Sequence, residues 1–295
     1  MSINNINIII IIIMFIVVIF LYNFQWNITH YIDNYRFENV IQNTLQNSFI
    51  QNLANKHHHP YPDVDFKKNA KILFLTYENR KNLKFVELHN LSIQNYCNKN
   101  EGKYDYLFLP FHPSLEKENV YWRKIYLTSI FLNAPQQSYD FIVWLDSDSV
   151  IMNSSFDLQS YLSLHPLKHI FMGVDGVIAN QGKHVSLNSG FFILRNSNVS
   201  RDFLHECIRA HEYDKAYGEI LDSALHIVKG TWAGIIYEQG RMNLLLGTSF
   251  AKYLKVMDNS VVLNSNNMCN FVDVFVLHLY RQKDEYRCSC FRLMK

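Results

Sequence analysis

The feature that most constrains the fold is a series of short apolar runs, of which residues 141–145 (FIVWL) form the clearest. This run has no polar side chain and no alternation, which is typical of a strand buried on both faces of a parallel sheet. Residues 71–77 (KILFLTY) and 104–109 (YDYLFL) have a similar length, and a proline closes the second of these. The sequence therefore predicts three buried strands in this part of the chain.

Helical patterns lie between these runs, at residues 80–98 and 119–132. Strands that alternate with helices indicate a central, mostly parallel sheet covered on both faces, so the expected fold class is α/β. Further strands are predicted at residues 170–174, 191–194 and 274–278, and further helices at residues 201–213 and 234–246.

Composition supports one catalytic domain, because 48% of the 295 residues are apolar and such a chain can bury a substantial core. The net charge is only +2, from 28 basic and 26 acidic residues, so no nucleic-acid partner is predicted. The five cysteines have no zinc-finger spacing. In an oxidising compartment they allow one or two disulfides and leave at least one thiol free.

The N-terminal region holds an uncharged apolar segment at residues 8–22 (IIIIIIMFIVVIFLY). As a helix it rises about 22 Å, so flanking apolar residues are needed to span a hydrocarbon core of about 30 Å. A cleaved signal peptide is the alternative, but residues 1–7 carry no Lys or Arg and no small-residue cleavage pattern follows. We therefore expect an uncleaved transmembrane signal anchor at 8–22, preceded by a short cytosolic tail at 1–7.

Residues 23–68 are polar and rich in Asn and Gln, and they are predicted to form a stem. Three adjacent histidines at 57–59 precede prolines and do not converge in a regular structure, which favours a solvated linker over a metal site. The expected catalytic domain is 69–295. The chain is thus predicted to be a single-pass type II membrane protein that faces the ER or Golgi lumen. N-x-S/T sequons support this topology at Asn27, Asn90, Asn153 and Asn198.

Two aspartates, Asp146 and Asp148, directly follow the apolar run at 141–145. Ligands bind at the carboxyl ends of strands in open α/β sheets, and acids at i and i+2 can reach one divalent cation that bridges to a diphosphate. A calcium loop of EF-hand type is excluded, because its sixth position requires Gly and its twelfth Glu. Those positions are Ile151 and Asp157 here.

A phosphatase of the haloacid-dehalogenase type is an alternative, because its first motif resembles the pattern around Asp146 and Asp148. That class also needs a second acidic cluster after a later strand, whereas Asp175, Asp258 and Asp273 each stand alone. Its first motif normally lies near the start of the domain, but two predicted strand–helix units precede Asp146.

The two aspartates belong to a wider set of five short stretches spread along the chain. These are YWRKI (121–125), WLDSDSVIMN (144–153), LNSGFFILRN (187–196), EQ (238–239) and VLHLY (276–280). Their order resembles the GT-A family of fungal α-galactosyl- and α-mannosyltransferases and plant xyloglucan xylosyltransferases. The resemblance covers roughly residues 70–287. That family typically has Phe and Gly after the late histidine, whereas this chain has Leu279-Tyr280-Arg281 after His278.

The resemblance implies a single GT-A (Rossmann-like) domain that uses Mn²⁺ or Mg²⁺. The reaction would transfer a hexose or pentose from a nucleotide-diphosphate sugar to a hydroxyl of a glycan or glycoprotein acceptor, with retention of configuration. The resemblance also assigns Asp148 to the metal, Asp146 to the donor and the metal, and His278 to completion of the metal site. Glu238 and Gln239 would line the sugar face, and which of them points inward stays open.

Residues in several segments are expected to bind the donor, and they are Thr76, Tyr77, Glu78, Lys124, Asn188, Ser189, Gly190 and Lys283. The end of the first strand would cradle the nucleoside, with Tyr77 against the base, and Lys283 would lie near the diphosphate. Glycine at 190 lets backbone approach a ligand closely. Trp122 is expected in the core. A catalytically inactive GT-A domain that binds sugar is a second alternative.

Overall fold

The computed structural model describes residues 69–80, 83–100, 102–110, 115–116, 118–134, 139–175, 187–225, 237–247, 249–265, 273–280 and 282–292. All of them belong to one compact unit, Tyr61–Lys295. The predicted tail, membrane anchor and stem lie outside the described residues. Within the ranges above, no helix combines the length and apolarity that a membrane crossing requires.

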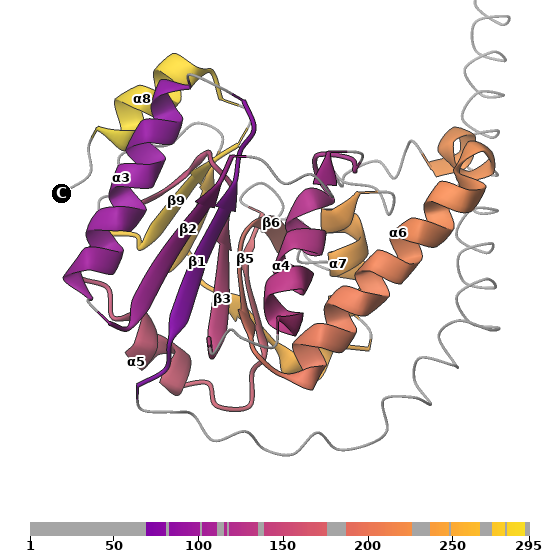
Figure 1. Cartoon of the computed structure of the whole chain (residues 1–295), viewed down its shortest axis with the longest axis horizontal. Helices are drawn as coiled ribbons and strands as arrows, with labels where there is room; N and C mark the ends of the chain where they lie inside the picture. Colours follow the sequence, from indigo (N-terminus) through magenta and orange to yellow (C-terminus); the bar gives the residue numbers. More distant parts are fainter. Residues whose placement is uncertain are drawn as a thin grey trace, which may run out of the picture. The chain divides into compact units, whose positions relative to one another are not determined.

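A six-stranded sheet forms the centre of the domain, in the order β2-β1-β3-β6-β5-β7. Figure 1 shows β2, β1 and β3 side by side. The strands are β1 (Ile72–Tyr77), β2 (Tyr104–Leu109), β3 (Phe141–Leu145), β5 (Ile170–Val174), β6 (Leu187–Arg195) and β7 (Leu254–Met257). Parallel pairs join β1 to β2 and β3, and β5 to β7, whereas β6 runs antiparallel to both of its neighbours. The prediction of a mostly parallel central sheet is thus confirmed, with β6 as the exception.

A smaller sheet in the order β4-β9-β8 was not predicted. It contains β4 (Ser149–Ile151), β8 (Val262–Ser265) and β9 (Val276–Leu279). β4 begins directly after Asp148 and runs antiparallel to β9, with Ser149 opposite His278. The chain therefore passes from the central sheet to the small sheet through the three residues 146–148.

Helices cover both faces of the central sheet. They are α3 (Lys84–Lys99), α4 (Arg123–Asn133), α5 (Leu158–Ser163), α6 (Asn198–Leu225), α7 (Glu238–Leu246) and α8 (Asp284–Phe291), with a 3-10 helix at Ala251–Tyr253. Figure 1 shows α3 and α8 on one side of the sheet and α4, α6 and α7 on the other. In α3 the buried positions Phe85, His89, Ile93 and Tyr96 recur every three or four residues, which places one apolar stripe against the sheet.

The pleat of β3 divides its side chains between two cores. Phe141, Val143 and Leu145 pack with the α3 side, whereas Ile142 and Trp144 pack with α4, α6 and α7. All five are at most 2% exposed, and burial of each large apolar side chain contributes about 1.5–3 kcal/mol. Continuing this alternation, Asp146 lies on the α4 side of the sheet.

Most predicted elements are confirmed, with shifted ends in several helices. One expectation was wrong: Asn188, Ser189 and Gly190 do not precede a strand but lie inside β6, which begins at Leu187. The pairing of β5 with β6 is irregular there, since Met172 pairs with Phe192 and Gly173 with Asn188. The strand therefore bulges on its β5 side across Ser189, Gly190 and Phe191.

Three cysteines, Cys97, Cys207 and Cys288, are free and buried. Cys290 is disulfide-bonded. This agrees with the expectation of a disulfide together with at least one free thiol.

Candidate active site

The loop Asp146–Asp148 is fixed at both of its ends by backbone hydrogen bonds. Asp146 N donates to the carbonyl of Gly190 in β6 at 2.8 Å, and Leu279 N in β9 donates to the carbonyl of Asp148 at 3.0 Å. One end of the loop is thereby held by the central sheet and the other by the small sheet.

Three side chains with metal-ligating atoms converge at this loop. Ligand atoms of Asp146, Asp148 and His278 all lie within 4.8 Å of one another. His278 reaches the group because β9 pairs with β4, and its Nε2 atom lies 3.1 Å from Oδ1 of Asp148. The structure thus brings together the three residues that the sequence analysis expected at a metal.

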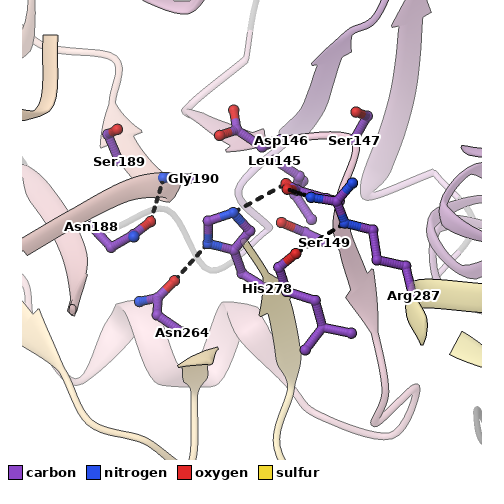
Figure 2. Close-up of polar contacts among 12 residues, drawn as sticks. Leu145, Asp146, Ser147, Ser149, Asn188, Ser189, Gly190, Asn264, His278 and Arg287 are labelled. Carbon is purple, nitrogen blue, oxygen red and sulfur yellow. Dashed lines mark hydrogen bonds and ion pairs between the residues drawn. The ribbon is translucent and has the colours of Figure 1, made fainter. Parts of the chain in front are cut away.

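A partner on its far side orients His278. Its Nδ1 atom lies 2.9 Å from Oδ1 of Asn264 (Figure 2). The amide nitrogen of Asn264 in turn donates to the carbonyl of Val174 at 2.9 Å. That second bond fixes the amide so that its oxygen accepts, and Nδ1 of His278 is then the donor. The lone pair of a neutral His278 is therefore directed from Nε2 towards Asp148.

A divalent cation fits this arrangement. A lone pair and a carboxylate oxygen 3.1 Å apart require a proton or a cation between them. Neighbouring ligands of an octahedral ion at about 2.1 Å are about 3 Å apart, which matches the observed separation. Asp148, His278 and Asp146 are thus suitable to hold a metal.

The charges around Asp148 keep it ionised. Burial by itself opposes ionisation, but when no metal is bound the pKa of Asp148 is lowered to about 2 by His278, if its Nε2 carries a proton, and by Arg287 and Lys124. Arg287 makes the closest contact, since its Nη2 donates to Oδ2 of Asp148 at 2.8 Å. Arg287 comes from α8 and was not anticipated from the sequence.

Lys124 in α4 joins two acids on the other side of the loop. Its Nζ donates to Oδ2 of Asp146 at 2.8 Å and lies 3.3 Å from Oε1 of Glu238. Burial alone would lower the pKa of Lys124, but the two carboxylates outweigh it and raise that pKa above its ordinary value. Asp146 also accepts from Nε1 of Trp144 at 2.7 Å, so both of its oxygens are oriented.

Glu238 and Gln239 at the start of α7 both point inward, at 3% and 5% exposure. Ser189 links them, because its hydroxyl donates to Oε1 of Glu238 at 2.7 Å and its N–H to Oε1 of Gln239 at 3.1 Å. The amide of Gln239 donates to Oδ2 of Asp175 at 3.3 Å. Both residues that the sequence left as alternatives thus face the interior.

Asp175 follows β5 and is 8% exposed. Its Oδ1 atom has no hydrogen-bond partner in the part of the chain that the structure describes. A buried acceptor of this kind is costly unless a ligand satisfies it. Sequence reasoning missed Asp175 as a site residue, and its place after a strand was the one available signal.

A cavity of about 360 Å³ lies beside the loop, and its lining includes Tyr77, Glu78, Lys124, Trp144, Asp146 and Asp148. A neighbouring cavity of about 610 Å³ shares Glu78, Asn79 and Arg80 with it. Glu78 is fixed between them, since it accepts from the hydroxyl of Ser147 at 2.6 Å and pairs with Arg80. The hydroxyl of Tyr77 donates to Glu116 at 2.7 Å.

Thr76 lies beneath the loop rather than in the lining of these cavities. Its hydroxyl oxygen is 3.1 Å from the carbonyl of Leu145 and 3.0 Å from Nε2 of His89, whose Nδ1 is 2.6 Å from the carbonyl of Ser149. Burial lowers the pKa of His89 to about 4, so the ring is neutral at pH 7. Thr76 and His89 therefore connect the residues on either side of the Asp146–Asp148 loop.

The remaining predicted residues have other surroundings. Lys283 precedes α8 and its side chain is exposed. The side chain of Asn188 accepts from Gly190 N at 2.7 Å and thus stabilises the bulge of its own strand. Trp122 is buried as expected and stacks on His211 with a ring distance of 3.9 Å. The donor-binding roles of Lys283 and Asn188 stay predictions.

Part of the chain matches a known protein family and two rice proteins. Residues 68–228 match the galactosyl transferase GMA12/MNN10 family, which is 161 of the 295 residues. Over 84 residues, 28% of this chain, the sequence is 32% identical to probable xyloglucan 6-xylosyltransferase 1 of Oryza sativa subsp. indica and of subsp. japonica. The matched segment spans only 18% of each rice protein.

A solved structure supports the fold assignment. The crystal structure of a glycosyltransferase involved in the glycosylation of the major capsid of PBCV-1 superimposes with a TM-score of 0.52 at 16% identity. The superposition covers 76% of this chain and 99% of that one. The family match also decides against the phosphatase alternative. The chain belongs to the galactosyl transferase GMA12/MNN10 family and is a glycosyltransferase.

Proposed function

We propose that this glycosyltransferase is metal-dependent and transfers a hexose or pentose from a nucleotide-diphosphate sugar to a hydroxyl of a glycan, with retention of configuration. The observation that carries the proposal is the convergence of Asp146, Asp148 and His278 beside the 360 Å³ cavity. The adjoining 610 Å³ cavity adds the space that a nucleoside requires.

When bound, the cation would stabilise the negative charge that grows on the diphosphate leaving group. Asp148, His278 and Asp146 would hold it, and an imidazole donor in this set suits Mn²⁺ better than the all-oxygen preference of Mg²⁺. Lys124 remains protonated between Asp146 and Glu238 and keeps these acids at fixed positions.

The surroundings of Glu238 support retention. An inverting enzyme needs a carboxylate base within reach of the acceptor hydroxyl. Oε1 of Glu238 is instead occupied by Ser189 and faces Lys124. In the retaining reaction, the bond from the anomeric carbon to the phosphate oxygen breaks and the acceptor oxygen bonds to the same face. The acceptor proton passes to the departing phosphate, so no protein base is required.

The test is a panel of hexose and pentose donors incubated with Mn²⁺ and candidate glycan acceptors. The family name motivates galactose donors, and the rice segment motivates xylose donors. NMR of the new linkage should show an α-linked product from an α-linked donor. A β-linked product would contradict retention but leave glycosyl transfer in place.

An inactive sugar-binding domain is the competing proposal. It predicts that Mn²⁺ and donor bind without any hydrolysis of the donor. We expect slow metal-dependent hydrolysis of the correct donor even without acceptor, measured as release of the nucleoside diphosphate.

We further propose that the domain lies in the ER or Golgi lumen on an N-terminal signal anchor, as the sequence of residues 8–22 suggests.

A further inference from the structure

The two carboxylate oxygens of Asp148 have different partners. Oδ1 lies 3.1 Å from Nε2 of His278, and Oδ2 accepts from Nη2 of Arg287 at 2.8 Å. Figure 2 shows His278 and Arg287 approaching the loop from opposite sides. The oxygen that faces the metal-ligating imidazole is therefore separate from the oxygen that binds the guanidinium.

Arg287 is held in place by contacts that do not involve Asp148. Its Nε donates to the carbonyl of Leu279 at 3.0 Å, and its Nη1 contacts Asp284 at 3.4 Å. Its guanidinium lies over the ring of Phe85, 4.9 Å from the centroid. The residue is only 8% exposed, so this planar group is fixed before any ligand arrives.

A divalent metal ion and an arginine guanidinium contact the carboxylate of Asp148 in different ways. A carboxylate binds a divalent ion through one oxygen or through both. Arginine remains protonated in proteins and never ligates a metal, so it acts only by occupying an oxygen. A guanidinium fixed on Oδ2 leaves Oδ1, next to Nε2 of His278, as the oxygen available to a cation.

We infer that Arg287 is a positioning residue that presents Asp148 to the metal through Oδ1 alone. This inference rests on the proposed metal dependence. Arg287 would act through Asp148 and would not touch the metal. The alternative that the experiment tests is a cation that takes both oxygens, which must displace Arg287 and makes the arginine a competitor.

The experiment measures Mn²⁺ affinity by electron paramagnetic resonance titration without any donor, in the full-length protein. The variant Arg287→Lys keeps the positive charge but cannot contact Leu279 and Asp148 at the same time. We expect its Mn²⁺ affinity to fall about 10-fold or more, as is usual when a residue that orients a ligand is lost. The melting temperature of the metal-free variant shows that it is folded.

Arg209→Lys is the matched control, because Arg209 also pairs with an acid, Glu206, but lies on α6 and is 45% exposed in its side chain. It should leave Mn²⁺ affinity unchanged. In an Asp148→Asn background, Arg287→Lys should have no further effect on the residual affinity, because its action passes through the carboxylate.

Two results would overturn the inference in different ways. Equal or tighter Mn²⁺ binding by Arg287→Lys, with normal binding by the wild type, identifies Arg287 as a competitor or a bystander and leaves the proposed function intact. Failure of the wild type to bind Mn²⁺ or Mg²⁺, with or without a nucleoside diphosphate, removes the metal dependence itself and this inference with it.

Discussion

Gly190 and His278 are so close that a Cβ atom on Gly190 would lie 2.1 Å from Cε1 of the imidazole. His278 is 3% exposed and bonded to Asn264, so it has little room to retreat. Gly190→Ala should therefore displace the ring and weaken Mn²⁺ binding about 10- to 100-fold, with a loss of stability of about 1–3 kcal/mol. Titration with Mn²⁺ and urea denaturation measure the two effects.

Gly247→Ala is the control for this variant, because a Cβ there would meet the carbonyls of Asn243 at 3.2 Å and Leu244 at 3.7 Å but no residue of the metal site. It should bind Mn²⁺ like the wild type. Normal metal affinity in Gly190→Ala would show that the imidazole is not a ligand or that the bulge of β6 relaxes.

Asp148→Ala should abolish sugar transfer and leave the fold intact. The substitution removes an oxygen next to His278 and leaves Arg287 without its acidic partner, so both the metal site and the local charge balance are lost. We expect a decrease in kcat of at least about 10³-fold, together with an unchanged far-UV circular dichroism spectrum. Substantial transfer by this variant, or by the wild type in excess chelator, would refute the metal-dependent mechanism.

Asp175→Asn should reduce transfer without changing Mn²⁺ affinity. The buried Oδ1 of Asp175 offers an acceptor to a sugar hydroxyl, and an amide nitrogen placed there would leave that hydroxyl unpaired. We expect kcat/KM to fall about 10- to 100-fold, which corresponds to about 1.4–2.8 kcal/mol. Asp258→Asn, at an acid bonded to Ser260, is the control and should be active. An equal loss of Mn²⁺ affinity would place Asp175 at the metal instead.

Acid should destabilise the domain in the range from about pH 6.5 to pH 4. Burial lowers the pKa of His89 and that of His169 from 6.5 to about 4 in the folded protein. The unfolded chain therefore binds more protons in this range, and the free energy of unfolding falls as pH decreases. Each histidine contributes on the order of 3 kcal/mol. His89→Gln should show a shallower pH dependence in urea denaturation between pH 7 and pH 4, and an unchanged slope would contradict the assignment.

The proposed topology predicts that residues 23–295 are protected from protease in sealed microsomes. At least one sequon should also carry a glycan, detected as a mobility shift after endoglycosidase treatment. Asn198 is better placed than Asn90, because Asn198 is exposed at the start of α6 whereas Asn90 is half-buried within α3 and accepts a hydrogen bond from Tyr106. Complete digestion of the domain in sealed vesicles would exclude the lumenal location.

Five of the six central strands could be predicted from sequence because short, mainly apolar runs of this kind have few other stable arrangements. The sixth, β7, has four residues with a lysine among them and was not predicted. The position of Asp146 and Asp148 followed from the strand before them. β4 and β8 could not be predicted, since three or four residues carry too little pattern and depend on pairing with β9. The contact of Arg287 with Asp148 joins residues 139 positions apart, and local sequence does not encode such a distance. Asp175 stands alone in the sequence, and only the folded chain brings Gln239 beside it.

The chain passes from the central sheet to the small sheet at residues 146–148, and the small sheet is completed by strands late in the sequence. This has a practical consequence for protein engineering. Asp146 and Asp148 lie in the segment that identifies the family, but His278, Asn264 and Arg287 all come after residue 228. A fragment cut to the family-defining segment would retain the acidic tripeptide and lack the imidazole and the guanidinium. Recombinant versions of the domain should therefore extend through α8, and a C-terminal tag needs a spacer beyond Phe291.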